Sequence, residues 1–280
     1  MAICAQIATF YILLKMILHF TNHGFKHAFF RLYIWRSIND LLGSVFYLLT
    51  LRLPGWGICT FYSHISTGLI PTLLYYFTAY FQAAHYLGTM LIALNRASAA
   101  ISPSAFEKIW SGRQTPLVLT LIFLVIPQIY ISFKLAFNGA QFINDHSFFY
   151  IATDLSNSDK MLMLFYMGFC ALIAFVANVY TSWRLFLHYR REPKTNRLDL
   201  HFQCFSLITF CFEIAQIIAQ LFVQNIIAIP FEIVFYIMEA MPILSDLSLL
   251  APIWFMLLVS NEARKALTWP HVKPQISQWP

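Results

Sequence analysis

Long apolar runs alternate with short polar connections along this 280-residue chain. Each run is at least about as long as the roughly 20-residue helix that crosses the hydrocarbon of a bilayer. Because backbone groups in lipid must form their hydrogen bonds within the spanning segment, helices are the expected structure. The pattern predicts seven transmembrane helices, at about 2–20, 32–51, 66–96, 115–137, 161–187, 200–228 and 232–259. We therefore expect an all-α integral membrane bundle over residues 1–259, followed by a short tail, 260–280.

The third predicted helix lies in the longest part of the chain without charge. Residues 53–95 contain no Asp, Glu, Lys or Arg, and the first charged residue after them is Arg96. Pro103, Lys108 and Arg113 follow within the next segment. Arg96 therefore marks the position at which this helix is expected to meet an aqueous face.

Composition supports a membrane protein. Hydrophobic residues make up 59% of the chain and charged residues 11%, against roughly 25% charged residues in soluble domains. This is too little polar surface to cover a soluble globule. Residues 1–20 lack both a basic start and a small-residue cleavage site, so they are predicted to form a first spanning helix rather than a signal peptide.

Positive charge is distributed unequally between the two ends of the predicted helices. One set of connections contains fourteen Lys and Arg residues and the other contains three. The fourteen are Lys26, Arg31, Arg36, Arg96, Lys108, Arg113, Arg184, Arg190, Arg191, Lys194, Arg197, Arg264, Lys265 and Lys273. The three are Arg52, Lys134 and Lys160, and Lys15 lies within the first helix. Because connections rich in Lys and Arg stay in the cytosol, the amino terminus is predicted outside and the carboxyl terminus inside.

Seven helices in this orientation are the layout of G-protein-coupled receptors. The net charge of +6 then reports orientation and does not imply nucleic acid as a partner. In the tail, the basic segment 261–269 also contains Leu267 and Trp269. It either lies flat as a helix on the anionic inner leaflet or is a disordered stub.

Arg96 has two interpretations. It is either an anchor whose side chain reaches the interface from a helix end, or a switch that an acidic partner restrains in the resting receptor. Asp199, near the start of the sixth predicted helix, is the candidate partner. Asn95 stands where many receptors have an acid, so no adjacent carboxylate restrains Arg96.

Two short motifs resemble those of a known family. Leu94-Asn95-Arg96 is followed by Pro103 and by Glu107-Lys108-Ile109-Trp110, and this pattern resembles the signature of nematode serpentine receptor class gamma and its related classes. Phe29-Phe30-Arg31-Leu32-Tyr33 is similar to the F-F-R-L segment of the same family. The resemblance implies a chemosensory G-protein-coupled receptor of the plasma membrane, or of the ciliary membrane of sensory neurons. It favours the switch role for Arg96, with Lys108 and Trp110 at the G-protein-coupling surface.

Five ionisable residues lie within the predicted helices. Each such residue costs roughly 2.5–3.5 kcal/mol (for Lys, Arg or Asp) on insertion scales, so each is expected to face the bundle interior or water. They are Lys15, Asp40, Glu213, Glu239 and Asp246. Asp40 and Asp246 are expected near a polar core, where Pro252 loosens the last helix by removing a backbone donor. This core either senses a cation or proton, or is a fixed network that sets helix register.

A ligand pocket is expected between the third, fifth, sixth and seventh helices, open to the outside. Mostly apolar walls with a few polar anchors suit a small organic ligand. The predicted polar anchors are Tyr75, Tyr76, Gln82, Glu213, Gln216 and Glu239.

Other functions are less compatible with the sequence. A ligand-gated channel of the insect odorant-receptor kind would have its amino terminus inside, against the charge distribution. A proton-coupled transporter would use Lys15, Asp40, Glu213 and Asp246, but the chain lacks the half-repeat of many transporters. His19, His23 and His27 recur every four residues without the further His clusters of a membrane oxygenase. We therefore expect no enzyme, no metal and no cofactor, and a small molecule and a heterotrimeric G protein as partners.

Overall fold

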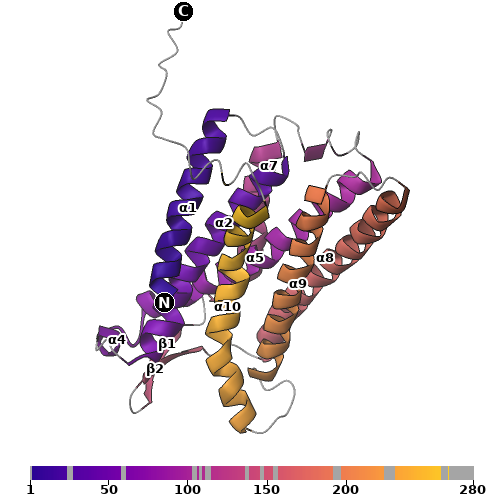
Figure 1. Cartoon of the computed structure of the whole chain (residues 1–280). Coiled ribbons are helices and arrows are strands. Elements are labelled where there is room, and N and C mark those ends of the chain that lie inside the picture. The colour runs from indigo at the N-terminus through magenta and orange to yellow at the C-terminus, as the bar shows by residue number, and fades with distance from the viewer. Residues whose placement is uncertain are drawn as a thin grey trace, which may run out of the picture.

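The protein is an elongated bundle of helices with a small β-hairpin at one end (Figure 1). The computed structural model describes residues 2–23, 28–57, 61–102, 106, 109–110, 115–135, 139–145, 148–153, 157–191, 197–223, 231–259 and 264. The hairpin lies at one end of the bundle, and α10 ends at the other (Figure 1).

Each predicted span falls on a long helix. The helices are α1 (Ala2–His23), α2 (Ala28–Tyr47), α5 (Leu69–Ile101), α7 (Thr115–Leu135), α8 (Asn157–Arg191), α9 (Arg197–Val223) and α10 (Phe231–Val259). Within the described residues, one stretch, Met161–His188 of α8, is long and apolar enough to cross a membrane by length and composition. Shorter apolar stretches lie in α1, α7 and α9. The predominance of helix thus agrees with the all-α prediction.

The carboxyl end of α2 widens into a π-helix, η1 (Leu48–Arg52), and continues into the short α3 (Leu53–Gly55). Pro54 lacks the N–H group that would continue the ladder, so the regular helix ends here. Such π-segments are frequent at functional sites. After the short α4 (Phe61–His64), Gly68 adopts a φ of 101° immediately before α5, a value that favours glycine.

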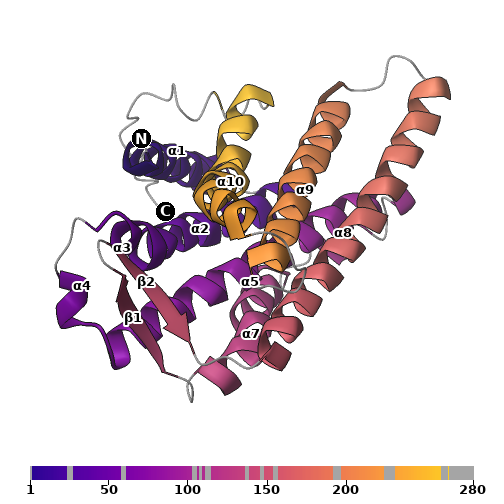
Figure 2. The ribbon, with the colours of Figure 1, turned by 90° about the horizontal axis from the view of Figure 1, so that it is seen from below.

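A β-hairpin between α7 and α8 was not predicted. Strands β1 (Ala140–Asp145) and β2 (Phe148–Thr153) pair antiparallel, with Ala140 opposite Thr153. The backbone N–H of Phe142 donates to the carbonyl of Ser66 at 2.7 Å, and the N–H of Ala140 donates to Thr72 Oγ1 at 3.1 Å. The hairpin is therefore attached to the amino end of α5, beside α4 (Figure 2).

Helix α5 is the central element, packed against α2, α7 and α8 (Figure 2). Small residues allow the close approach of α2 and α5, as they do in membrane helix packing generally. A Cβ atom added at Gly43 would lie 3.0 Å from the Cβ of Phe81, and one added at Gly88 would lie 3.2 Å from the Cγ of Arg36. Helix α9 also contacts α5, α8 and α10, helix α10 contacts α1 and α2, and α1 contacts α2.

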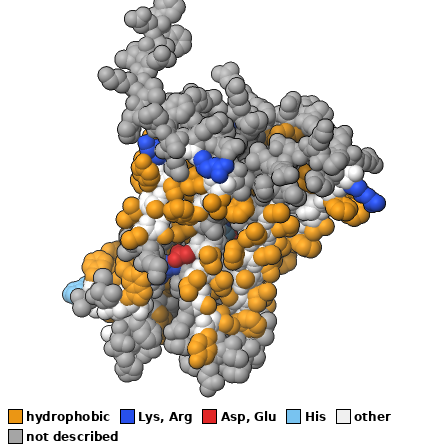
Figure 3. Space-filling model, viewed as in Figure 1, with side chains coloured by type: hydrophobic (Ala, Val, Ile, Leu, Met, Phe, Trp, Pro, Cys, Tyr) orange, Lys and Arg blue, Asp and Glu red, His pale blue; other side chains and the backbone are white. Residues whose placement is uncertain are grey.

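The outside of the bundle is apolar. Large side chains such as Phe165 (73% exposed) and Leu172 (61% exposed) point away from the protein along α8. Figure 3 shows hydrophobic side chains over most of the described surface on this face, with Lys and Arg mainly towards the end opposite the hairpin. Such a surface suits a bundle whose solvent is lipid.

Candidate functional site

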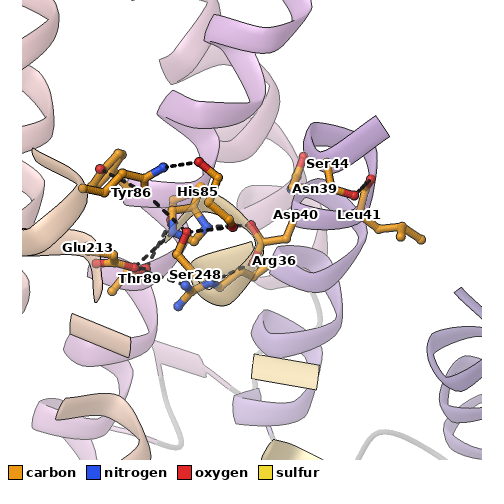
Figure 4. A network of polar contacts seen from close by, with 12 residues as sticks. Arg36, Asn39, Asp40, Leu41, Ser44, His85, Tyr86, Thr89, Glu213 and Ser248 are labelled. Atoms are coloured by element: carbon orange, nitrogen blue, oxygen red, sulfur yellow. Dashed lines mark hydrogen bonds and ion pairs between the residues drawn. The ribbon is translucent and has the colours of Figure 1, made fainter. Parts of the chain in front are cut away.

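A buried ionic cluster joins α2, α5 and α9, and consists of Arg36, Asp40, His85, Thr89 and Glu213 (Figure 4). Arg36 and Asp40 are four residues apart and therefore lie on one face of α2. The Nε of Arg36 is 3.3 Å from Oδ2 of Asp40, and its Nη2 is 3.1 Å from Oε1 of Glu213. One guanidinium thus binds carboxylates from two helices.

His85 of α5 lies between the same two carboxylates. Its Nδ1 is 2.8 Å from Oδ1 of Asp40, and its Nε2 is 3.3 Å from Oε1 of Glu213. The hydroxyl of Thr89 also donates to Glu213 Oε1. The imidazole of His85 thus lies between a carboxylate of α2 and a carboxylate of α9.

Burial makes this cluster a strong constraint on the helices. The four charged side chains are at most 4% exposed. Removing one partner of a buried ion pair leaves an uncompensated charge and is destabilising by roughly 3–5 kcal/mol. The relative position of α2, α5 and α9 is therefore coupled to the integrity of the cluster.

A second ion pair connects η1 to α10. The Nη2 of Arg52 is 2.8 Å from Oδ2 of Asp246. The guanidinium of Arg52 also lies 5.9 Å from the centre of the Tyr47 ring. Asp40 and Asp246, predicted to meet in one polar core, therefore bind different arginines.

Two arginines of the charge count are buried and paired with carboxylates. Arg36 was counted on the cytosolic side, at the entry of the second predicted helix, and Arg52 on the external side. Arg36 lies about 12 Å along α2 from Ala28, since each helical residue rises 1.5 Å. Without these two residues, thirteen Lys and Arg residues lie on one side and two on the other, so the charge distribution still predicts the same orientation.

A pocket of about 120 Å³ lies beside the ionic cluster, towards the hairpin end of α5. It is lined by Tyr47, Thr50, Leu51, Tyr75, Thr78, Ala79, Gln82, Met163, Gln216, Gln220 and Met241. These residues come from α2, η1, α5, α8, α9 and α10. Three of the predicted polar anchors, Tyr75, Gln82 and Gln216, are brought together in this lining.

The other predicted anchors lie elsewhere. Tyr76 donates its hydroxyl to Gln128 of α7 and does not line this pocket. Glu213 belongs to the ionic cluster, one helical turn from Gln216. The side chain of Glu239 lies outside what the structure describes. Gln220 was missed, although its spacing of four residues from Gln216 places both on one face of α9.

Gln216 connects the pocket to a polar network in the bundle. Its Nε2 donates to Ser245 Oγ at 3.1 Å, and its Oε1 accepts from Tyr86 at 3.5 Å and from Ser248 at 3.4 Å. Tyr86 follows His85 on α5, and Glu213 lies three residues before Gln216 on α9. The lining of the pocket is therefore within one helical turn of the ionic cluster on two helices.

At the opposite end of the bundle, Trp110 is buried. Its Nε1 donates to Ser98 Oγ at 2.8 Å, and its ring packs in a core with Leu32 and Tyr33. A buried indole positions the segment after α5 and does not itself offer an exposed contact to a partner. Arg96 is partly buried, while Lys108 and the side chains of Asp199 and Pro252 lie outside the described residues.

The predicted absence of metal remains a prediction. Among the described residues, no group of three His, Cys, Asp or Glu side chains is arranged to hold a metal ion. Lys15 is not part of the ionic cluster, and its ammonium lies 5.8 Å from the ring centre of Tyr11 on the same helix.

Comparison with known proteins identifies the family. No curated protein matches the chain significantly. The family model of the Srg family chemoreceptors matches residues 3–267, which covers the described helices except the first residue of α1, and both motifs that resemble serpentine receptor class gamma. The chain therefore belongs to the Srg family of chemoreceptors.

Proposed function

We propose that this protein is a seven-helix chemosensory receptor that binds a small molecule from outside the cell and signals to a heterotrimeric G protein. Its family membership supports the chemosensory role. The structural observation that carries the proposal is the pocket that shares Gln216 with the polar network next to the ionic cluster. A ligand in this pocket would contact residues that are coupled to the packing of α9.

The proposed orientation places the hairpin and the pocket outside and the carboxyl terminus in the cytosol of a plasma-membrane receptor. Thirteen Lys and Arg residues in one set of connections against two in the other support it. Tyr75 and Thr78 lie in the first third of α5, whose amino end carries the hairpin. A ligand arriving from outside would therefore reach the pocket from the hairpin end.

Signalling would proceed by a population shift. In the resting state, Glu213 of α9 is held by Arg36 of α2 and by His85 and Thr89 of α5. A ligand that binds better when Gln216 moves would favour states in which α9 separates from these partners. Movement of α9 would then open the cytosolic end of the bundle.

The G-protein surface would be formed by segments 96–113 and 187–199. Their basic residues suit a partner that lies against an anionic leaflet. Arg96 is the proposed switch residue, with Asp199 as its proposed resting partner and Lys108 on the same surface. Trp110 would act by holding the segment through Ser98.

The test is a calcium or cyclic-nucleotide response in heterologous cells exposed to a panel of small volatile and water-soluble compounds. We expect at least one compound to evoke a response that requires a G protein. Arg96→Ala should reach the cell surface and lose this response, whereas Arg264→Ala, at an exposed position, should retain it. A ligand-evoked ion current without G protein, or uptake that depends on a proton gradient, would contradict the proposal.

A further inference from the structure

The pocket is lined by uncharged groups. Its polar side chains are three glutamines, two threonines and two tyrosines, and its apolar walls include Leu51, Met163 and Met241. Among the described side chains, the charges near the pocket are matched, since Arg52 is paired with Asp246, and Glu213 is bound by Arg36. A charged ligand would lose its hydration here without gaining a counter-charge, which is unfavourable. The lining therefore selects for an uncharged molecule.

The hydrogen-bonding groups of the lining are not all satisfied. Gln216 uses both ends of its amide, and Thr78 donates to the carbonyl of Leu74 at 2.8 Å and contacts Thr50 at 2.9 Å between hydroxyl oxygens. The Oε1 of Gln220 is buried and accepts no hydrogen bond from the described residues. Gln220 lies one turn from Gln216, on the same face of α9.

A buried acceptor without a donor is costly, and a ligand that supplies the donor removes this cost. The same site rejects an analogue of equal size that lacks the donor, because the buried acceptor then stays unpaired. Gln82, on α5, also lines the pocket and offers a second polar contact. Met163 and Met241 are flexible side chains that adapt to the apolar part of a ligand.

We propose that the pocket takes a small uncharged molecule with a hydroxyl or amide N–H group, which donates to Gln220 Oε1 while its apolar part contacts Met163 and Met241. This inference rests on the proposed function in taking the pocket as the ligand site. It adds the chemical class of the ligand and the residue that selects it.

The test uses probes of matched size on the purified full-length protein in lipid nanodiscs. Primary alcohols and primary amides of four to eight carbons are compared with ethers, amines and carboxylates of equal heavy-atom count. 1-Hexanol, pentyl methyl ether, hexylamine and pentanoate form one such set. Thermal unfolding reports binding, and the G-protein response of intact cells is recorded with the same probes.

We expect at least one alcohol or amide to raise the unfolding temperature, and its ether or charged counterparts to do so only at about tenfold higher concentration or not at all. Gln220→Leu should weaken alcohol binding about tenfold. Gln220→Glu should invert the selectivity, so that hexylamine binds better than hexanol. Ile218→Leu is the matched control, because Ile218 lies on α9 and is 46% exposed. This variant should bind the alcohols as the native protein does.

The outcomes separate this inference from the proposed function. Binding that depends on Gln220 without any G-protein response would overturn the proposed function alone. A G-protein response unchanged in Gln220→Leu would overturn the inference alone. The inference is also overturned if no alcohol or amide binds, or if ethers or charged probes bind the native protein equally well. It is overturned as well if Gln220→Glu reaches the cell surface and still binds hexanol better than hexylamine.

Discussion

Arg36 and Glu213 lie 177 residues apart in the chain, yet Nη2 of Arg36 is 3.1 Å from Oε1 of Glu213 (Figure 4). The pair connects α2 to α9 across α5, and both side chains are at most 4% exposed. In a bundle whose helices have apolar surfaces against lipid, the hydrophobic effect does little to hold one helix against another. Buried polar contacts of this kind therefore decide which arrangement of helices is preferred.

The first prediction concerns this link. Glu213→Gln keeps the size of the side chain but removes its charge, so Arg36 loses one of its two carboxylate partners. We expect a loss of roughly 3–5 kcal/mol in the free energy of unfolding and a rise in basal signalling per surface receptor, because α9 is released. Thermal unfolding and a ligand-free G-protein assay measure the two effects.

Arg36→Met combined with Glu213→Met is the control for charge burial. Replacing a buried pair by apolar side chains of similar size is often neutral or stabilising, so the double variant should be more stable than either single one. If the double variant loses as much free energy of unfolding as the two single variants together, Arg36 and Glu213 do not interact.

The second prediction concerns the space that Arg36 occupies. A Cβ atom added by Gly88→Ala lies 3.2 Å from the Cγ of Arg36 and 3.4 Å from its Cβ and Cδ. We expect destabilisation of about 1–3 kcal/mol, because α2 and α5 must move apart or Arg36 must shift. Gly168→Ala on α8 meets nothing within 4 Å, so it should be neutral or stabilising by up to about 1 kcal/mol. Equal effects of the two substitutions would mean that Gly88 is not a close-contact position.

The third prediction compares the two ion pairs. The Asp246 side chain is 30% exposed, whereas that of Glu213 is 1% exposed. Arg52 is only 7% exposed and would keep a buried charge, but Asp246 is less buried than Glu213, so Asp246→Asn should cost less than Glu213→Gln, about 1–3 kcal/mol in the free energy of unfolding. A loss as large as that of Glu213→Gln in the same thermal assay would show that the Arg52 pair is as constraining as the ionic cluster.

The fourth prediction concerns Trp110. Trp110→Phe keeps most of the ring packing and loses the hydrogen bond to Ser98, which should cost about 0.5–1.5 kcal/mol. Ser98→Ala removes the same bond, so the two substitutions together should cost less than the sum of their separate effects. If the losses of Trp110→Phe and Ser98→Ala are strictly additive, the two side chains do not interact. If Trp110→Phe reduces the G-protein response without a loss of stability, Trp110 instead has a direct role in coupling.

The sequence predicts the long helices well, because apolar runs bounded by charge require helices in lipid. Helix ends differ by several residues; α5, for example, starts at Leu69 rather than at 66, after the positive φ of Gly68. The β-hairpin was missed because its strands are only six residues each and their stability comes from contacts with α4 and α5.

The candidate site was predicted only in part. Glu213 was correctly expected to face the interior, but its partner Arg36 was assigned to a cytosolic connection, since charge alone does not report depth in a helix. Tyr75 lines the pocket while adjacent Tyr76 contacts Gln128, because neighbouring residues of a helix point about 100° apart. Gln220 was missed, although it is four residues from Gln216 and this helical spacing places both side chains on one face of α9.

The most direct test of the account is the sidedness of the chain in the membrane. An epitope at residue 1 should be stained in intact cells, and an epitope at residue 280 only after permeabilisation. This result would place the pocket on the extracellular side of the membrane and segments 96–113 and 187–199 on the cytosolic side. Staining of residue 280, but not residue 1, in intact cells would contradict the account, as would staining of both or of neither at a surface-expressed receptor.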